Sequence, residues 1–167
     1  MFVGSQPQLM AEYNRWMNEK LYAAAASLSD DQRKADLGAF FKSIHATFEH
    51  ILHADTLWMK RFRGEPLKAA APGFAYPEFD ALRAVRQERD QELLDWSATL
   101  TDDWLKGEYS WTSVAGRVFT SPAFAVVSQI FNHQTHHRGQ ITTLLMQQGI
   151  DPGVTDIPML PVLQVVG

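Results

Sequence analysis

Residues 121–148 carry the clearest helical pattern in the chain: S-P-A-F-A-V-V-S-Q-I-F-N-H-Q-T-H-H-R-G-Q-I-T-T-L-L-M-Q-Q. Apolar residues recur in it at intervals of three and four, which is the period of one helix face. Ser121 favours a helix N-cap, and Pro122 is tolerated at the first helical position. Gly149 directly follows the stretch and is a typical helix stop. The sequence therefore predicts a helix from Ser121 to about Gln148.

Three of the six histidines of the chain lie inside this predicted helix, at positions 133, 136 and 137. At about 100° per residue, the apolar stripe is centred roughly 70° from His133, and His137 lies at about 40°. His133 is thus expected at the edge of the stripe and His137 within it, whereas His136 should face outward. Two imidazoles one turn apart can converge on a metal ion, and they can also form a buried hydrogen-bonding patch.

Three further segments show helical periodicity of apolar residues. They are predicted as helices over approximately 6–28, 37–62 and 78–100. The polar cluster at 27–31 predicts a turn, and Gly64 predicts a stop after the second helix. Phe40 is assigned to the apolar stripe of the second helix. Charged residues between the apolar positions of the third are expected to form a solvated face.

The connecting segments differ in composition from the helices. Residues 67–77 (L-K-A-A-A-P-G-F-A-Y-P) predict a loop within one domain. Residues 104–120 are dense in aromatic and β-branched residues, which indicates a short hairpin or an extended crossover. The tail after Gly149 contains three prolines. We expect it to be extended and packed over the bundle or a partner.

These elements together predict an all-α protein. Four amphipathic helices favour an up-down four-helix bundle with a long crossover connection and a possible short hairpin before the last helix. A chain of 167 residues fits one domain, which we take as residues 1–167.

Composition restricts the function classes. The net charge of −4 argues against a broad nucleic-acid surface. The chain contains no run of about 18 apolar residues, so no membrane span is expected. The N-terminal residues show no signal-peptide pattern, and we therefore expect a cytoplasmic protein. The chain has no cysteine, which excludes disulfides, a cysteine nucleophile and thiolate-held metal. Any metal must be held by His, Asp, Glu, other oxygen donors or water.

A third metal ligand is expected on the predicted helix 37–62, which contains His45, His50 and His53. The apolar stripe of that helix is centred near Ile51. His50 lies about 100° from this centre, His45 about 120° and His53 about 160°. Helical phase therefore favours His50, but only slightly.

Four motifs, in this order along the chain, resemble the DinB-like (DinB/YfiT) family of metal-binding four-helix bundles. Y-N-R-W-M-N-E-K-L at 13–21 is similar to the first helix of the family. H-I-L-H-A-D-T-L-W-M-K-R-F-R-G at 50–64 resembles its pattern H-I-L-x-A-D-x-x-W-x-x-R-x-x-G. N-H-Q-T-H-H-R-G-Q-I at 132–141 resembles N-H-x-x-x-H-R-G-Q, and G-I-D-P-G-V-T-D at 149–156 resembles its usual tail.

The resemblance implies a metal triad of His50, His133 and His137, with His53 at a variable position of the motif. It implies a divalent metal, zinc or nickel, and a homodimer. Family members that use small thiols imply thiol-dependent S-transfer or isomerisation on a small-molecule substrate. Because the chain lacks cysteine, such a thiol must be a low-molecular-weight cosubstrate.

Three imidazoles leave at least one coordination position open, where a water or a thiol can bind. The preferred hypothesis is a small-thiol-dependent transferase. A metal-dependent hydrolase is the alternative, weakened because no glutamate like that of H-E-x-x-H is found. A non-catalytic, stress-related metal-binding protein, or histidines that only hydrogen-bond to one another, are further readings.

Several residues are candidates around the triad. Gln140 is a candidate to hold a ligand imidazole by a hydrogen bond, and Arg138 to hold an anion or form a dimer contact; a solvated side chain is the alternative for both. Asp55 and Glu49 are candidate carboxylate ligands or partners of the ligands, although Asp55 is equally expected as a helix-surface charge. Trp16 is a candidate pocket residue, as are Tyr13 and Trp58, with a core position as the alternative.

Overall fold

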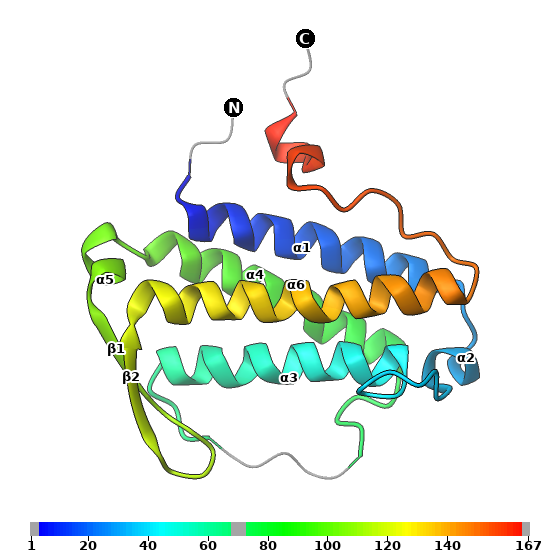
Figure 1. The fold of residues 1–167 in the computed structure, drawn as a ribbon, viewed down its shortest axis with the longest axis horizontal. Coiled ribbons are helices and arrows are strands. Elements are labelled where there is room, and N and C mark those ends of the chain that lie inside the picture. Colours follow the sequence, from blue (N-terminus) through cyan, green and yellow to red (C-terminus); the bar gives the residue numbers. More distant parts are fainter. Residues whose placement is uncertain (1–3, 68–72, 165–167) are drawn as a thin grey trace.

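The computed structural model describes residues 4–67 and 73–164; residues 1–3, 68–72 and 165–167 lie outside its described part. Four long helices make up most of it (Figure 1). They are α1 (Gln6–Ala25), α3 (Ile44–Phe62), α4 (Phe79–Thr99) and α6 (Ala123–Gln147). Both α1 and α3 pack against α4 and α6, which places α1 and α3 at opposite corners. The predicted four-helix bundle is confirmed.

The end of α3 and the start of α4 lie at opposite ends of the bundle (Figure 1). Figure 1 shows the two helices pointing in the same direction, so the chain must return from the end of α3 to the start of α4. This is the predicted long crossover. Of the loop predicted at 67–77, residues 68–72 lie outside the described residues, and residues 73–77 form neither helix nor strand.

The start of α3 differs from the prediction. The predicted helix began at residue 37, but α3 begins at Ile44. Ser43 is its N-cap and accepts a backbone N–H of the first turn at 3.1 Å. Lys42 has a positive φ of 67°, which a right-handed helix cannot contain. Phe40, predicted on the apolar stripe, is consequently 84% exposed.

The end of the first helix was also predicted differently. α1 ends at Ala25 rather than at about residue 28. Residues 26–28 form a turn, as predicted, but the last two residues of the predicted turn belong to a short helix, α2 (Asp30–Lys34). Ser29 and Gln32 form a capping box, in which the Ser29 hydroxyl accepts the Gln32 N–H at 3.2 Å. The end of the predicted turn is therefore the beginning of a helix.

Two long helices end at glycines, as predicted. Gly64 and Gly149 follow α3 and α6 with φ of 67° and 77°, a left-handed conformation that favours glycine. In both, the N–H of the next residue returns to a carbonyl five residues earlier at 2.9 Å. These bonds satisfy the last carbonyls of each helix.

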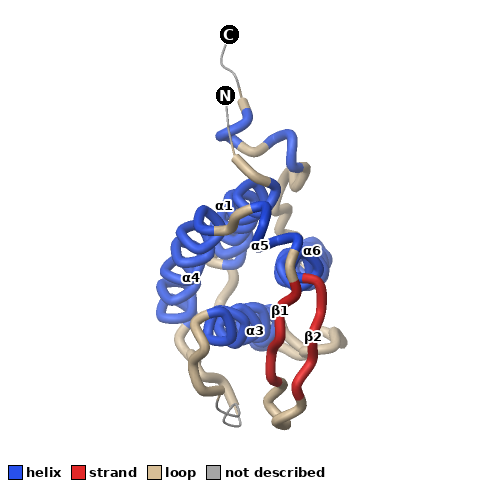
Figure 2. Tube along the Cα trace, turned by 90° about the vertical axis from the view of Figure 1, so that its left-hand side faces the viewer, coloured by secondary structure: helices blue, strands red, loops and turns tan. Residues whose placement is uncertain are grey.

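A two-stranded hairpin precedes α6, as the aromatic and β-branched composition predicted. It follows the short helix α5 (Asp102–Lys106) and consists of β1 (Glu108–Thr112) and β2 (Val118–Pro122). Figure 2 shows both strands running from α6 alongside α3. Ser121 pairs within β2 opposite Tyr109, and Pro122 is the N-cap of α6. The predicted capping role of Ser121 is wrong, because the strand pairing claims this residue.

Aromatic side chains fasten the hairpin to α3. Trp111 of β1 stacks on Phe119 of β2 with ring centroids 4.7 Å apart, and Trp58 of α3 meets Trp111 edge-on at 5.2 Å. Trp58, considered as a pocket residue, therefore belongs to this contact.

The C-terminal tail packs on the bundle, through two 3-10 turns, η1 (Ile157–Met159) and η2 (Pro161–Leu163). Leu160 between them is buried in the main core cluster. The Tyr13 hydroxyl of α1 donates to the carbonyl of Thr155 at 2.7 Å. In the described part of the chain, no helix is both long enough and apolar enough to cross a membrane.

Candidate metal centre

Three histidines from two helices meet at one point. α3 supplies His50, and α6 supplies His133 and His137. One ring nitrogen of each lies within 4.8 Å of the others, and the Nε2 atoms of His50 and His133 are 3.0 Å apart. Among the described residues, no other three His, Asp or Glu side chains gather in this way.

The donor set suits a divalent transition metal. Imidazole is a common ligand of zinc and nickel, and two nitrogens bound to one zinc at about 2.0–2.1 Å lie roughly 3 Å apart. Mutual hydrogen bonding explains the cluster less well. It accounts for the contact of His50 with His133, but His137 makes no hydrogen bond to either imidazole within the described structure.

Burial keeps two of the imidazoles neutral. Burial, together with the neighbouring His137 and His133, lowers the pKa of His50 to about 4. Burial and the neighbouring His137 and His136 lower the pKa of His133 to about 4 as well. At neutral pH the nitrogen lone pairs of both rings are therefore available to a metal.

Gln140 orients the third imidazole. Its side-chain carbonyl oxygen lies 2.9 Å from His137 Nδ1. When this oxygen accepts a hydrogen bond from Nδ1–H of the neutral ring, Nε2 is unprotonated and its lone pair is free to bind a metal. Gln140 thus contacts a histidine of the cluster, as the sequence analysis expected, from about one turn further along α6.

Phe41 covers the centre and was missed from the sequence. Its ring stacks on His50 with centroids 3.9 Å apart and lies edge-on to His137 at 5.4 Å. The segment around it was predicted as helix. This segment is instead the loop before α3, and it directs the Phe41 ring onto the histidines.

A pocket of about 480 Å³ lies beside His50. Its walls come from one face of α3 and from residues 73–76, and its polar lining is Glu49, His53 and Thr56. Glu49 accepts the backbone N–H of Tyr76, which holds the loop against α3. The cavity provides room for a small molecule next to a histidine of the cluster.

His45 is buried, although helical phase placed it away from the apolar stripe. Its Nε2 lies 2.9 Å from the carbonyl oxygen of Tyr76, so the loop before α4 covers it. His53 and His136 are exposed, as expected. Neither residue belongs to the cluster.

The carboxylates considered as ligands have other partners. Glu49 contacts Tyr76, and neither Glu49 nor Asp55 is part of the cluster. Asp55 is only 1% exposed and forms an ion pair with Arg86. The prediction of a helix-surface charge is wrong, because α4 and α6 close over this position.

Arg138 and Trp16 also differ from their expected roles. Arg138 is 3% exposed, neither solvated nor open to an anion, and its Nη1 donates to the side chain of Asn14. Trp16 is half-buried against Tyr13, with ring centroids 6.0 Å apart, and Lys20 lies over its ring at 4.5 Å. Trp16 therefore packs at the edge of the main core cluster, close to the core position that was its alternative.

Comparison with known proteins identifies relatives over most of the chain. The sequence profile of the DinB family matches residues 1–164. The curated protein DinB of Bacillus subtilis (strain 168) is 23% identical over 161 aligned residues, which cover 87% of each chain. A four-helix bundle, a three-histidine cluster and a match over nearly the whole length coincide: the chain belongs to the DinB family.

Proposed function

We propose that this protein is a metal-dependent enzyme that transfers a small thiol. His50, His133 and His137 hold a divalent zinc or nickel ion. The observation that carries the proposal is the convergence of three ring nitrogens within 4.8 Å, with no carboxylate joining them among the described residues. Three protein ligands are typical of catalytic sites, which keep a position open, whereas structural sites are closed by a fourth.

A divalent ion bound there would favour the thiolate form of a thiol at its open position. In the transfer, the thiol sulfur forms a bond to an electrophilic carbon of the substrate. The thiol proton leaves to solvent, and the leaving group departs with the bonding electron pair. Gln140 keeps His137 in one tautomer, and Phe41 excludes water from one side.

The thiol must be a low-molecular-weight cosubstrate, because the chain has no cysteine. The pocket of about 480 Å³ beside His50 is of a size suited to a small molecule. Its mixture of apolar walls with Glu49, His53 and Thr56 supports a substrate that carries both apolar and polar groups.

We further propose that the protein acts in the cytoplasm as a homodimer. Apolar side chains exposed on α6, including Phe124 at 58% and Met146 at 54%, supply surface for self-association. Sedimentation at micromolar concentration should give twice the chain mass of 18.9 kDa. A monomer mass would contradict the dimer without affecting the metal site.

Metal content of protein purified without an affinity tag tests the site. Wild type should hold close to one zinc or nickel per chain, and His50→Ala, His133→Ala and His137→Ala should each lose it. His136→Ala removes an exposed neighbouring histidine and should retain the metal. A wild type that takes up neither metal would refute the proposal.

Turnover with a panel of small thiols and carbon electrophiles tests the chemistry. Transfer should require both thiol and metal, and it should vanish in His137→Ala. Thiol-independent hydrolysis of activated esters by the loaded protein would favour the hydrolase instead. Full metal occupancy without thiol binding or turnover would leave a metal-binding protein that is not this enzyme.

A further inference from the structure

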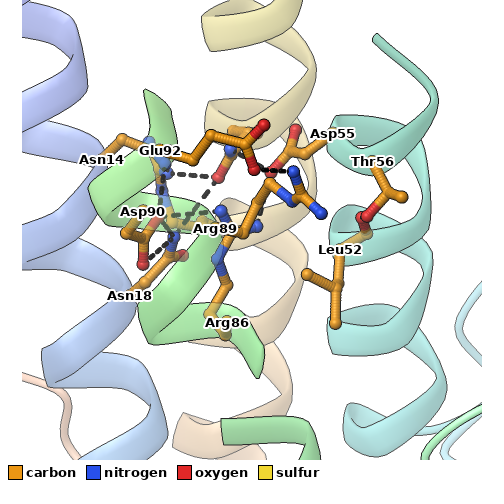
Figure 3. A network of polar contacts seen from close by, with 11 residues as sticks. Asn14, Asn18, Leu52, Asp55, Thr56, Arg86, Arg89, Asp90 and Glu92 are labelled. Atoms are coloured by element: carbon orange, nitrogen blue, oxygen red, sulfur yellow. Dashed lines mark hydrogen bonds and ion pairs between the residues drawn. The ribbon is translucent and has the colours of Figure 1, made fainter. Parts of the chain in front are cut away.

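The centre of the bundle contains charged and amide side chains where apolar packing is usual. We call this group the central polar network, and it draws members from all four long helices: Asn14, Asn18, Asp55, Arg86, Asp90, Gln134 and Arg138. None of them is more than 3% exposed. Figure 3 shows Asn14 and Asn18 of α1, Asp55 of α3, and Arg86 and Asp90 of α4 directed toward one another.

Arg86 links three of the helices. Its guanidinium forms ion pairs with Asp55 of α3 and, at 2.9 Å, with Asp90 on its own helix. Asp90 in turn accepts hydrogen bonds from Asn14 at 3.0 Å and Asn18 at 2.9 Å. Burial alone would lower the pKa of Arg86, but the two carboxylates raise it, so the group stays charged.

α6 joins the network through two residues. The side-chain amide of Gln134 donates to Asp55, and Arg138 donates to Asn14 and, at 3.0 Å, to the side-chain oxygen of Gln134. Gln134 is fully buried. Its bond to Asp55 joins the same two helices, α3 and α6, that supply the three histidines.

The positions along α6 connect the network to the metal centre. Gln134 and Arg138 directly follow His133 and His137, so each polar residue lies about 100° around the helix from a ligand. Any rotation of α6 that moved His133 away from His50 would also break the Gln134–Asp55 bond. The histidines and the network residues of α6 therefore move together when this helix rotates.

The hydrogen bonds of the network differ from apolar core contacts because their strength depends on direction. Apolar burial is non-directional and tolerates small rotations of a helix. A buried hydrogen bond does not, because each unpaired donor or acceptor costs about 1–3 kcal/mol, and more when a charge is involved. The network therefore selects one rotation of α6.

We propose that Asp55 and Gln134 are positioning residues for the metal centre, with Arg86 holding Asp55 in place. They set the rotation of α6 that brings His133 and His137 to His50, and thereby the affinity and coordination geometry of the bound metal. This inference rests on the proposed metal function for its metal readouts. It also makes a claim about the imidazoles that holds without metal.

Zinc affinity and the absorption spectrum of the cobalt(II)-loaded protein test the inference. In Gln134→Leu, which leaves both Arg86 ion pairs intact, zinc should bind about 10- to 100-fold more weakly. The cobalt spectrum should change as well, because it reports ligand geometry. Asp55→Asn should act in the same direction, and the double variant Asp55→Asn/Gln134→Glu should recover affinity, since amide and carboxylate exchange places.

Leu93→Ala is the matched control. Leu93 is a fully buried residue of α4 outside the network, and its truncation removes core packing without touching these bonds. It should lower the free energy of unfolding yet keep wild-type zinc affinity and the same cobalt spectrum. If Gln134→Leu behaves like Leu93→Ala, the network is merely structural and the inference is overturned.

A measurement on metal-free protein separates this inference from the proposed function. Proton NOEs between the His50 and His133 rings, whose centroids are 4.9 Å apart, should be present in wild type and in Leu93→Ala. They should be lost in Gln134→Leu and restored in the double variant. A wild type that shows this pattern but binds no metal would refute the metal function alone; NOEs unchanged in Gln134→Leu would refute the positioning role.

Discussion

The imidazoles of His50 and His133 are held close together in a half-buried site, and both conditions oppose protonation. Protons and metal ions compete for the same nitrogen lone pairs. Because the pKa of each ring is lowered to about 4, protons compete weakly down to mildly acidic pH. Neutral imidazoles are the form that can bind a metal, and keeping them neutral costs stability in acid.

The metal-free protein should lose stability as the pH falls from about 6.5 to about 4. In this window the two histidines are protonated in the unfolded protein but stay largely neutral in the folded protein. Proton binding therefore favours the unfolded state. Allowing for solvent screening, we expect a loss on the order of 1 kcal/mol per histidine. Urea unfolding with a chelator present, at several pH values, measures it.

The double variant His50→Ala/His133→Ala isolates this effect. Burial raises the pKa of Asp55 to about 6, with Arg86 opposing, which works in the other direction over part of the same window. Asp55 is present in both proteins, so its contribution cancels in the comparison. Equal pH dependence of wild type and double variant would show that the two histidines titrate normally in the folded state.

Gln140→Leu should weaken zinc binding about 10- to 100-fold, because the variant loses the hydrogen bond that selects the His137 tautomer. Competition with a chromophoric chelator measures the affinity. Gln147→Leu, an exposed glutamine on the same helix, is the control and should bind as wild type. Unchanged affinity in Gln140→Leu would mean that the ring is held by its packing alone.

At the scale of elements, the beginning of α3 matters most for the site. Ser43 caps the helix two turns before His50, and the loop before it turns Phe41 onto the imidazoles. The cap therefore determines both where α3 begins and which residue covers the histidine cluster.

Ser43→Ala should lower the free energy of unfolding by about 1 kcal/mol, since it leaves a backbone N–H of the first turn without its side-chain acceptor. Ser128→Ala replaces an exposed serine on α6 and should change it little. Urea denaturation of the two variants makes the comparison. A stable Ser43→Ala would indicate that tertiary packing alone holds this helix end.

At the scale of the whole molecule, aromatic packing joins three helices. Phe48 of α3 lies against Tyr22 of α1, with centroids 4.0 Å apart, and against Phe79 of α4 at 6.4 Å. Figure 1 shows that these helices come from separate parts of the chain. The cluster is a long-range contact on which the assembly of the bundle depends.

Phe48→Ala should destabilise the protein by about 3–5 kcal/mol, because it leaves a cavity in a closely packed core. Phe40→Ala removes the same side chain from an 84% exposed position and should cost little. The midpoints of their urea unfolding curves, compared with wild type, test both. Similar midpoints for the two variants would contradict the assignment of Phe48 to the core.

Local patterns in the sequence were sufficient for the four long helices and for the glycine stops of α3 and α6. The choice of His50 as the partner of the α6 histidines depended on the family resemblance, because helical phase favoured it only slightly. Helical periodicity depends on neighbours three and four residues away, which the sequence displays directly. The sequence also contains an indication that Gln134 is buried, because this residue lies only about 30° from the centre of the α6 apolar stripe. A polar residue at that phase predicts a buried partner.

The tertiary structure alone decided which polar residues are buried and what they contact. Asp55, Arg86 and Asp90 are ordinary surface residues on an isolated helix, and only their meeting between four helices compensates the charges. Arg138 is likewise buried only in the folded chain, because its hydrogen-bond partner Asn14 lies 124 positions away in the sequence. Phase tells which face of a helix a residue occupies, but burial depends on what the rest of the chain places opposite that face.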